Sequence, residues 1–138
     1  MLKTMKITVL FDGKCGVCSK EISFYKRLSP LRQFIWQDVN SINSKEKYNI
    51  ELHAALKHLH VIDNEKIFIG VDAFARIWKN IKYFKFLSFL IQLPLIYSLA
   101  KYFYNIFAEY RFKRLKHCQI LKKETEWNFF SCWFCLCC

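Results

Sequence analysis

The chain has 138 residues, of which 54% are hydrophobic and 24% charged, so it can bury a core, and a disordered tail or a fibrous repeat is excluded. Its formal net charge of +11 permits attraction to acidic proteins or to an anionic membrane surface. Because the basic residues are scattered and no nucleic-acid-binding motif occurs, we expect no nucleic acid partner.

The first predicted elements are a strand, a tight turn and a helix. Residues 6–11 are mostly apolar and rich in β-branched side chains, which is typical of a central strand, and Asp12-Gly13 is a turn signal. From Cys18 onward apolar residues recur at helical spacing as far as the proline at position 30, which ends the helix. This order places Cys15 and Cys18 where a buried strand turns into a helix.

The middle of the chain predicts three further strands. The strands are expected at residues 33–39, 58–62 and 66–69, a loop at 40–47, and helices at 51–57 and 72–81, the second of them capped by Asp72. Asp63-Asn64-Glu65 is a short turn-rich connection that favours a hairpin between the last two strands. The element order therefore predicts an α/β fold with a four-stranded mixed sheet flanked by helices.

A C-terminal helical extension is predicted over about residues 82–115, broken at Pro94. Its most apolar run, residues 86–100, is shorter than the roughly 20 residues of a membrane span. Its large apolar side chains are too numerous to face water, so we expect them to pack on the sheet and leave Lys82, Lys85 and Lys101 in solvent. The side chains expected to be buried are Phe86, Leu87, Leu90, Ile91, Leu95, Phe103 and Phe107.

The seven cysteines are unevenly distributed. The last four, Cys132, Cys135, Cys137 and Cys138, lie in a tail of residues 119–138 that we expect to fall outside a domain formed by residues 1–118. Clustered cysteines can bind a soft metal or carry an acyl group, or they can simply form an oxidation-prone terminus. His117 and Cys118 are adjacent in sequence and are not expected to act as a catalytic pair.

Cys15 and Cys18 form a Cys-x-x-Cys motif at the predicted start of a helix. The helix N-terminus stabilises a thiolate, and two intervening residues let the second thiol reach a mixed disulfide formed by the first. We therefore expect Cys15 to be the exposed attacking thiol, with a lowered pKa, and Cys18 to be the buried resolving thiol. Lys14 adds positive charge, whereas Asp12 opposes the thiolate unless it caps the helix or shares a proton.

Two other interpretations of this pair remain open, a metal half-site and an inert pair. A zinc ribbon requires a second cysteine pair about 15–20 residues away. The next such pair is Cys132 and Cys135, far downstream, and no histidine has ligand spacing to Cys15 or Cys18. We therefore expect neither a metal nor a bound cofactor.

The segment Leu10–Cys18 resembles the opening motif, aromatic-Asp-Gly-x-Cys-x-x-Cys, of the DCC family of thiol–disulfide oxidoreductases, also described as a domain of unknown function. Further blocks follow in the family's order and extend the resemblance over about residues 6–115. They include Trp36-Gln-Asp38, Leu59-His-Val-Ile62, Gly70-Val-Asp-Ala-Phe74, Leu93-Pro94 and Tyr104–Arg111. The resemblance implies a thioredoxin-like fold and redox use of Cys15 and Cys18, supported by Asp12, Gly13 and Lys14.

The chain departs from thioredoxins in two places that line their active site. Val17 stands where thioredoxins have a proline, and no proline precedes residues 58–62, where thioredoxins place a cis-proline. Substrate docking is therefore expected to differ. Asp72, Tyr104 and Arg111 are secondary candidates: Asp72 as a cap or acid, Tyr104 as a buried partner, and Arg111 as a buried partner or an anion-binding residue.

The sequence thus predicts a protein-disulfide reductase or related thiol–disulfide oxidoreductase that acts on protein or small-molecule thiols and disulfides. An external electron donor such as thioredoxin or glutathione must supply its electrons. The N-terminal apolar stretch is too short for a signal peptide, so a cytoplasmic location is expected. The alternative is a non-catalytic thioredoxin-like module whose aromatic, basic extension docks on a protein or makes peripheral contact with an anionic membrane.

Overall fold

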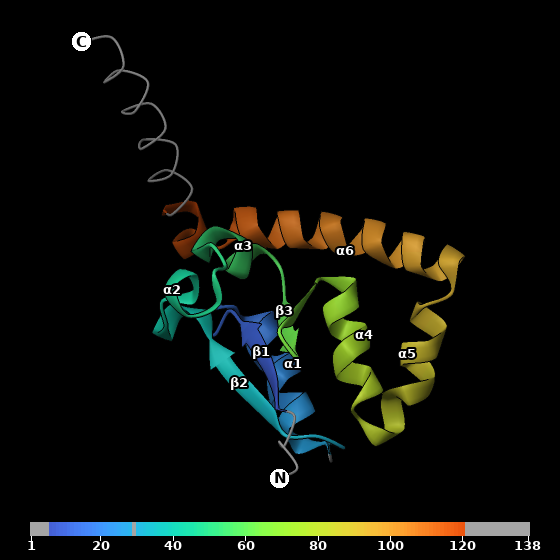
Figure 1. Cartoon of the computed structure of the whole chain (residues 1–138). Helices are drawn as coiled ribbons and strands as arrows, with labels where there is room; N and C mark the ends of the chain where they lie inside the picture. Colours follow the sequence, from blue (N-terminus) through green and yellow to red (C-terminus); the bar gives the residue numbers. More distant parts are fainter. Residues whose placement is uncertain (1–5, 29, 121–138) are drawn as a thin grey trace, which may run out of the picture.

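The computed structural model describes residues 6–28 and 30–120, so the four cysteines of the predicted tail lie outside the described residues. The strands are β1 (Ile7–Phe11), β2 (Phe34–Asp38), β3 (His60–Asp63) and β4 (Lys66–Ile69). The α-helices are α1 (Gly16–Arg27), α2 (Ser44–Tyr48), α3 (Leu52–Lys57), α4 (Val71–Lys79), α5 (Lys85–Ile91) and α6 (Pro94–Arg114). Two short 3-10 helices, η1 (Val39–Ser41) and η2 (Lys82–Phe84), lie between them. Figure 1 shows their arrangement.

The four strands form one mixed sheet in the order β2-β1-β3-β4. Strand β1 pairs in parallel with β2, and the β1–β3 and β3–β4 pairs are antiparallel. The hairpin turn between β3 and β4 holds Asn64 and Glu65 in the left-handed region, with φ values of 50° and 66°. The structure therefore confirms the predicted α/β architecture, a thioredoxin-like four-stranded mixed sheet flanked by helices.

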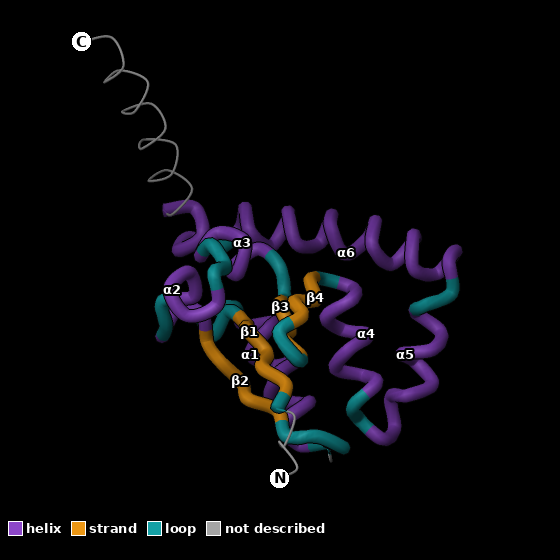
Figure 2. Tube along the Cα trace, viewed as in Figure 1, coloured by secondary structure: helices purple, strands orange, loops and turns teal. Residues whose placement is uncertain are grey.

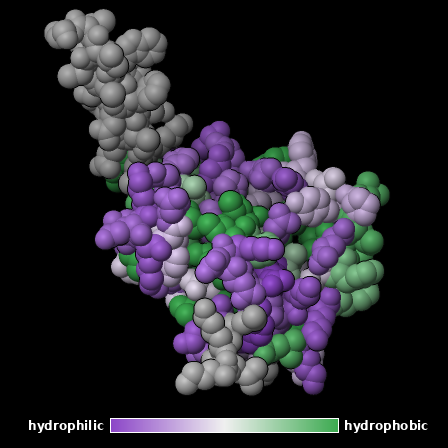
Figure 3. Space-filling view, in the orientation of Figure 1, coloured by the Kyte–Doolittle hydropathy of each residue, from purple (hydrophilic) through white to green (hydrophobic). Residues whose placement is uncertain are grey.

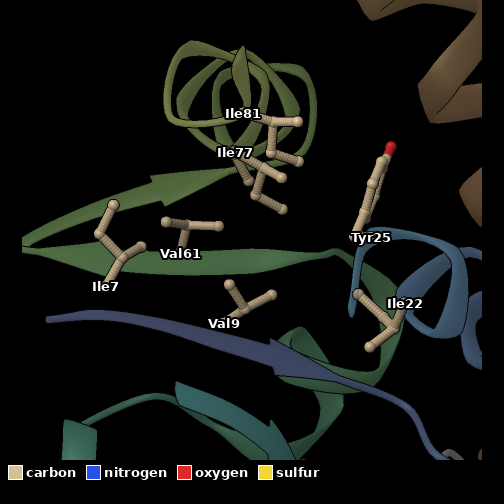
Figure 4. Packing of buried hydrophobic residues seen from close by; sticks show 8 residues of the cluster. Ile7, Val9, Ile22, Tyr25, Val61, Ile77 and Ile81 are labelled. Carbon is tan, nitrogen blue, oxygen red and sulfur yellow. The ribbon is translucent and has the colours of Figure 1, made fainter. Parts of the chain in front are cut away.

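Helices cover both faces of this sheet (Figure 2). Because side chains alternate along a strand, Ile7 and Val9 of β1 face one side and Leu10 faces the other. On the first side, Ile7 and Val9 pack with Val61 of β3 and with side chains of α1 and α4 (Figure 4). On the second side, Leu10 belongs to a cluster formed by α3, the end of α6 and the segment that follows it. Strand β1 is thus the centre of the core, and the Cys-x-x-Cys turn follows it directly.

A buried carboxylate ties three segments together at the far end of β3. Asp63 accepts two hydrogen bonds from Arg32, at 3.0 and 2.9 Å, and forms a second ion pair with Arg76 of α4. Burial by itself would raise the pKa of Asp63, but the hydrogen bonds from Arg32 and Arg76 outweigh it and hold that pKa below its usual value. This network fixes α4 and the segment before β2 to the sheet.

The structure differs from the sequence predictions in two local features. The expected loop over residues 40–47 contains η1 and α2, because Asp38 and Asn43 cap these short helices with their side chains. Asp72 does not cap α4: the cap residue is Gly70, and Asp72 lies in the first turn, where its carboxylate accepts a hydrogen bond from the Tyr97 hydroxyl at 3.1 Å. A negative charge in the first turn of α4 still interacts favourably with the helix dipole.

Helices α5 and α6 form an angled extension beside the sheet (Figure 1). Within residues 6–28 and 30–120 no single helix is long and apolar enough to cross a bilayer. Residues 82–91 and α6 have the necessary length and composition together, but they meet at a bend of 96°. Helix α5 packs on α4, where the Ser88 hydroxyl donates to the Ala75 carbonyl at 2.9 Å. Helix α6 then runs back across the end of the sheet and reaches α3.

The prediction that the apolar side chains of this extension pack on the sheet is wrong for four of the seven. Leu87, Leu90 and Ile91 are half-buried. The exposed four are Phe86, Leu95, Phe103 and Phe107. The reason lies in the register of α6, whose inward face carries small or polar-tipped residues such as Tyr104, Ala108 and Arg111. The three lysines predicted to be in solvent are exposed.

The Asp63 network gives the first testable prediction. Replacing Asp63→Asn leaves two arginines beside a buried neutral group and should lower the free energy of unfolding by about 3 kcal/mol at pH 7. Because the pKa of Asp63 is lowered by folding, its contribution is present above the unfolded pKa of about 4 and is lost as the pH falls below that value. Urea unfolding of both proteins at pH 7 and pH 3 measures the difference, which should shrink at pH 3.

The exposed Asp72→Asn variant is the control. It should cost less than about 1 kcal/mol, the scale of a surface charge in a first helical turn. An Asp63→Asn protein as stable as the Asp72→Asn protein at pH 7 would contradict the role given to the network.

Candidate functional site

The Cys-x-x-Cys motif lies in the turn between β1 and α1, as the sequence predicted. The backbone N–H of Cys15 donates to the Asp12 carbonyl at 3.2 Å, and that of Lys14 donates to an Asp12 carboxylate oxygen at 3.1 Å. The Ser19 hydroxyl donates back to the Gly13 carbonyl at 2.8 Å. These local hydrogen bonds turn the chain sharply out of β1 and set the start of α1.

Gly13 is required at this turn because another strand end approaches it. β2 ends beside β1, with Asp38 paired to Phe11, and the Asp38 carboxylate accepts the Gly13 N–H at 3.0 Å. A Cβ atom at residue 13 would overlap that carboxylate. Asn40 completes the contact by donating to both Asp38 and Asp12, at 2.9 and 2.8 Å. Asp38 and Asn40 were not predicted as site residues, although parallel strands do bring their carboxyl ends together.

The Cys15 sulfur is the N-cap of α1. It accepts a hydrogen bond from the backbone N–H of Cys18 at 3.5 Å, so it satisfies one of the free N–H groups at the start of the helix. A helix N-terminus carries partial positive charge and favours an anion at this position. Cys18 lies one turn further along the same helix.

Arg111 of α6 completes the site from the other side. Its guanidinium donates to the Cys18 sulfur at 3.0 Å and, through its other nitrogen, to the carbonyls of Leu56 and Lys57 at 2.6 and 2.8 Å. It also lies 3.9 Å from the Asp12 carboxylate. The side chain is buried, with the residue 8% exposed. The sequence offered Arg111 only as a secondary candidate, and the structure brings it into contact with the thiol pair.

The two thiols have opposite pKa shifts. Burial raises the pKa of Cys15, but the Cys18 N–H, the Arg111 guanidinium and the Cys18 thiol together hold that pKa below its ordinary value. Burial is also the main reason that the pKa of Cys18 rises to about 12, and the neighbouring Cys15 and Asp12 charges add to this. The direction predicted for Cys15 is therefore that of the structure, and Cys15 is the thiol of the pair that ionises first.

The predicted order of exposure is wrong. Cys15 is buried, with 2% of its surface exposed, whereas Cys18 is partly exposed. The C-terminal end of α6 and the residues after it lie over the turn, where Arg111, Arg114 and Leu115 line the same depression as Cys15. The local sequence around Cys15 predicts an open turn. The segment that lies over Cys15 is about a hundred residues away in the sequence, so no local pattern indicates it.

His117 and Cys118 also meet at this turn, although the sequence gave them no role. The imidazole Nε2 atom of His117 lies 2.9 Å from the Asp12 carboxylate, and Cys118 is fully buried beside it. Ligand atoms of Asp12, His117 and Cys118 lie within 4.8 Å of one another, and these are zinc-binding groups. The Arg111 cation 3.9 Å from the same carboxylate opposes a second cation there. Burial raises the pKa of the Cys118 thiol to about 11.

Cavities of different sizes border the two thiols. The first, lined by Cys18, Arg111 and Tyr104, has a volume of about 30 Å³, which accommodates water but no larger molecule. The second is an open depression of about 500 Å³ beside Cys15. Its walls are mainly the side chains of Val17, Phe107, Tyr110 and Leu115, with Lys20 and Arg114 at its edge. The larger depression therefore offers a substrate a route to the Cys15 side of the pair.

The remaining sequence candidates have different positions. Tyr104 packs against Gly70, whose φ of 61° and close approach leave no room for a Cβ atom, and its hydroxyl accepts the Leu59 N–H at 3.0 Å. Tyr104 is therefore a structural partner that also lines the small cavity. Lys14 is exposed next to the turn. Among the described residues, the only hydrogen bond found for the Asp72 carboxylate leads to Tyr97, away from the thiols.

Comparison with known proteins identifies the family. The sequence model of the DCC1-like thiol-disulfide oxidoreductase family matches residues 9–117, and the chain therefore belongs to this family. A protein of Arabidopsis thaliana described as an uncharacterized chloroplastic protein is 22% identical over 110 residues, which cover 77% of this chain. The matched region spans about half of that relative, 51% of its length. No solved structure matches the chain.

The position of Arg111 predicts its effect on the thiols. Replacing Arg111→Met should raise the pKa of Cys15 by about one unit or more, because an adjacent opposite charge stabilises the thiolate by at least that much. The measurement is the rate of iodoacetamide labelling against pH in a full-length protein whose other five cysteines are replaced. Peptide mapping should find the label first on Cys15, below the ordinary thiol pKa of about 8.5.

Lys113→Met removes an exposed cation two residues away and serves as the control. It should leave the labelling profile of Cys15 unchanged. Equal shifts in the Arg111→Met and Lys113→Met proteins would mean that overall charge, and not the contact, sets the pKa.

Proposed function

We propose that the protein exchanges its Cys15–Cys18 dithiol with the disulfides of protein or small-molecule substrates, with Cys15 as the attacking thiol and Cys18 as the resolving thiol. The observation that carries this proposal is the pairing of a helix-capping Cys15 sulfur with a buried Arg111 guanidinium 3.0 Å from Cys18. The family match supports thiol–disulfide redox chemistry in general. The roles of the two cysteines are our inference from their surroundings.

The first step is attack by the Cys15 thiolate on one sulfur of the substrate disulfide. The substrate S–S bond breaks, a Cys15–substrate disulfide forms, and the released substrate thiolate takes a proton from water. The lowered pKa of Cys15 increases the fraction of this thiol that is present as thiolate. Because Cys15 is almost fully buried, the substrate sulfur must reach it through the apolar depression formed by Val17, Phe107 and Tyr110.

The second step releases the other half of the substrate. Once Cys15 is in the mixed disulfide it carries no charge, so the repulsion that helps to raise the pKa of Cys18 disappears while Arg111 stays at 3.0 Å. Cys18 then loses its proton more easily and attacks the Cys15 sulfur. The Cys15–substrate bond breaks, the Cys15–Cys18 disulfide forms, and the second substrate thiol leaves. Two electrons have passed from the protein to the substrate.

A further dithiol or two thiols must return these electrons to Cys15 and Cys18. Thioredoxin and glutathione are donors of this class, and a reducing cytoplasm, our proposed location, contains both. The reverse reaction, in which the Cys15–Cys18 disulfide oxidises a substrate dithiol, uses the same two steps in the opposite order. The reduction potential of the pair decides which direction prevails.

Substitution of the two cysteines tests the assignment. In an insulin reduction assay with a dithiol donor, Cys15→Ser and Cys18→Ser should each lower turnover by at least about 100-fold, since either change removes a bond-forming sulfur. Only the Cys18→Ser protein should accumulate a mixed disulfide, which mass spectrometry detects as an adduct on Cys15. Cys118→Ala, which removes a buried thiol outside the motif, should retain turnover.

The result also separates catalysis from a purely docking role. A Cys15→Ser protein that retains full turnover would contradict the proposal. Wild-type protein that neither reduces insulin nor forms an adduct in the Cys18→Ser variant would favour the non-catalytic binding module.

A further inference from the structure

The outward faces of α5 and α6 carry a continuous band of exposed apolar side chains. Leu95 is 81% exposed and Phe86 is 74% exposed, values typical of polar surface residues rather than of leucine and phenylalanine. The band, called here the apolar face, consists of Phe86, Phe89, Leu93, Leu95, Leu99, Tyr102, Phe103, Ile106 and Tyr110. Figure 3 shows hydrophobic residues gathered where α5 meets the start of α6. A soluble monomer rarely leaves such a band uncovered.

The spacing along α6 shows that this exposure follows a regular helical pattern. At about 100° per residue, the α6 members of the apolar face from Leu95 to Tyr110 fall within a sector of about 100°. Tyr104, Ala108 and Arg111 lie on the opposite side and hold the helix to the sheet and to α3. Helix α6 therefore has two distinct faces, one fixed to the protein and one that is mainly apolar and exposed. The exposed face of such a helix can enter a membrane interface.

The charges around the apolar face are mainly positive, although Asp72 also reaches α6 through its hydrogen bond from Tyr97. Residues 82–120 contain seven lysines and arginines and one acidic residue, Glu109. Glu109 is already paired with Lys57 and Lys113, at 2.5 and 3.5 Å. Lys82, Lys85 and Lys101 are exposed next to the apolar residues. The extension thus combines uncompensated positive charge with apolar surface.

From this combination we infer that the apolar face of α5 and α6 docks the protein on an anionic lipid surface, with the apolar side chains entering the headgroup region and the lysines contacting acidic headgroups. The charge argues against the main competing occupant, a second copy of the chain. A dimer through this face would bring two extensions of the same positive sign together, whereas an acidic bilayer attracts them. The bend of 96° between the helices suits a surface position, since neither helix crosses a bilayer alone.

Flotation of the full-length, reduced protein with vesicles tests this inference. It should bind vesicles of mixed phosphatidylcholine and phosphatidylglycerol, bind vesicles of phosphatidylcholine alone much more weakly, and lose part of its binding at high salt. Leu99→Gln with Phe103→Gln removes two exposed apolar side chains from the middle of α6 and should weaken binding at least tenfold. Leu31→Gln with Ile67→Gln removes two similarly exposed side chains elsewhere and should leave binding unchanged.

A second pair of variants tests the charge contribution. Lys85→Gln with Lys101→Gln should lower the affinity for acidic vesicles about 25-fold, or about fivefold for each lysine. Lys47→Gln with Lys66→Gln removes the same charge from exposed positions outside the extension and should have a much smaller effect. Circular dichroism and insulin reduction without lipid, measured on every variant, show that the fold and the thiol site are intact.

Two outcomes would overturn the inference. One is the absence of binding to acidic vesicles at low salt by a protein that is folded. The other is a wild-type dimer, seen by analytical ultracentrifugation, that Leu99→Gln with Phe103→Gln converts to a monomer, because the apolar face would then be covered by a second copy. Neither outcome depends on whether Cys15 and Cys18 catalyse disulfide exchange.

Discussion

The burial of a single guanidinium, that of Arg111, is the constraint on which the site and the placement of α6 both depend. A buried cation is strongly unfavourable unless its hydrogen bonds are satisfied. Arg111 donates to the carbonyls of Leu56 and Lys57, which end α3 and have no partner within that helix, and it donates to Cys18. One side chain therefore fixes α6 to α3, satisfies the end of a helix and places positive charge beside two thiols.

The two thiols differ because the same cation meets two different local environments. Cys15 occupies the cap position, where the N–H of Cys18 reaches its sulfur, so its anion is stabilised by the helix as well as by Arg111. Cys18 lies within the helix and has no such backbone donor, and burial dominates its ionisation. Asp12 adds a negative charge that is itself held by Asn40 and His117. A pair of identical side chains thus acquires two separate functions from the turn in which they lie.

Local patterns in the sequence were sufficient for the elements but not for their contacts. The alternation in β1, the turn signal after it and the periodicity of α1 depend on neighbouring residues, and the strand–turn–helix unit could be predicted from them. The contacts of Arg111 and His117 cross 93 and 105 residues, so the covering of Cys15 had no local signal. The periodicity of residues 94–114 predicts the helix α6. Which face of α6 turns inward depends on the fit of Tyr104 against Gly70 and of Arg111 against α3. Apolar content alone predicts that the opposite face is buried.

The separation of 93 residues between Cys18 and Arg111 has a consequence for the protein during its synthesis. The ribosome releases the Cys-x-x-Cys turn long before α6 exists, and until α6 is in place Cys15 lacks its guanidinium neighbour. A thiol with an ordinary pKa is only a few per cent ionised at pH 7. The capping N–H of Cys18 is part of the turn itself, whereas the Arg111 contribution to the lowered pKa of Cys15 is added only when α6 packs over that turn. The full reactivity of the thiol therefore depends on a contact that forms late in synthesis.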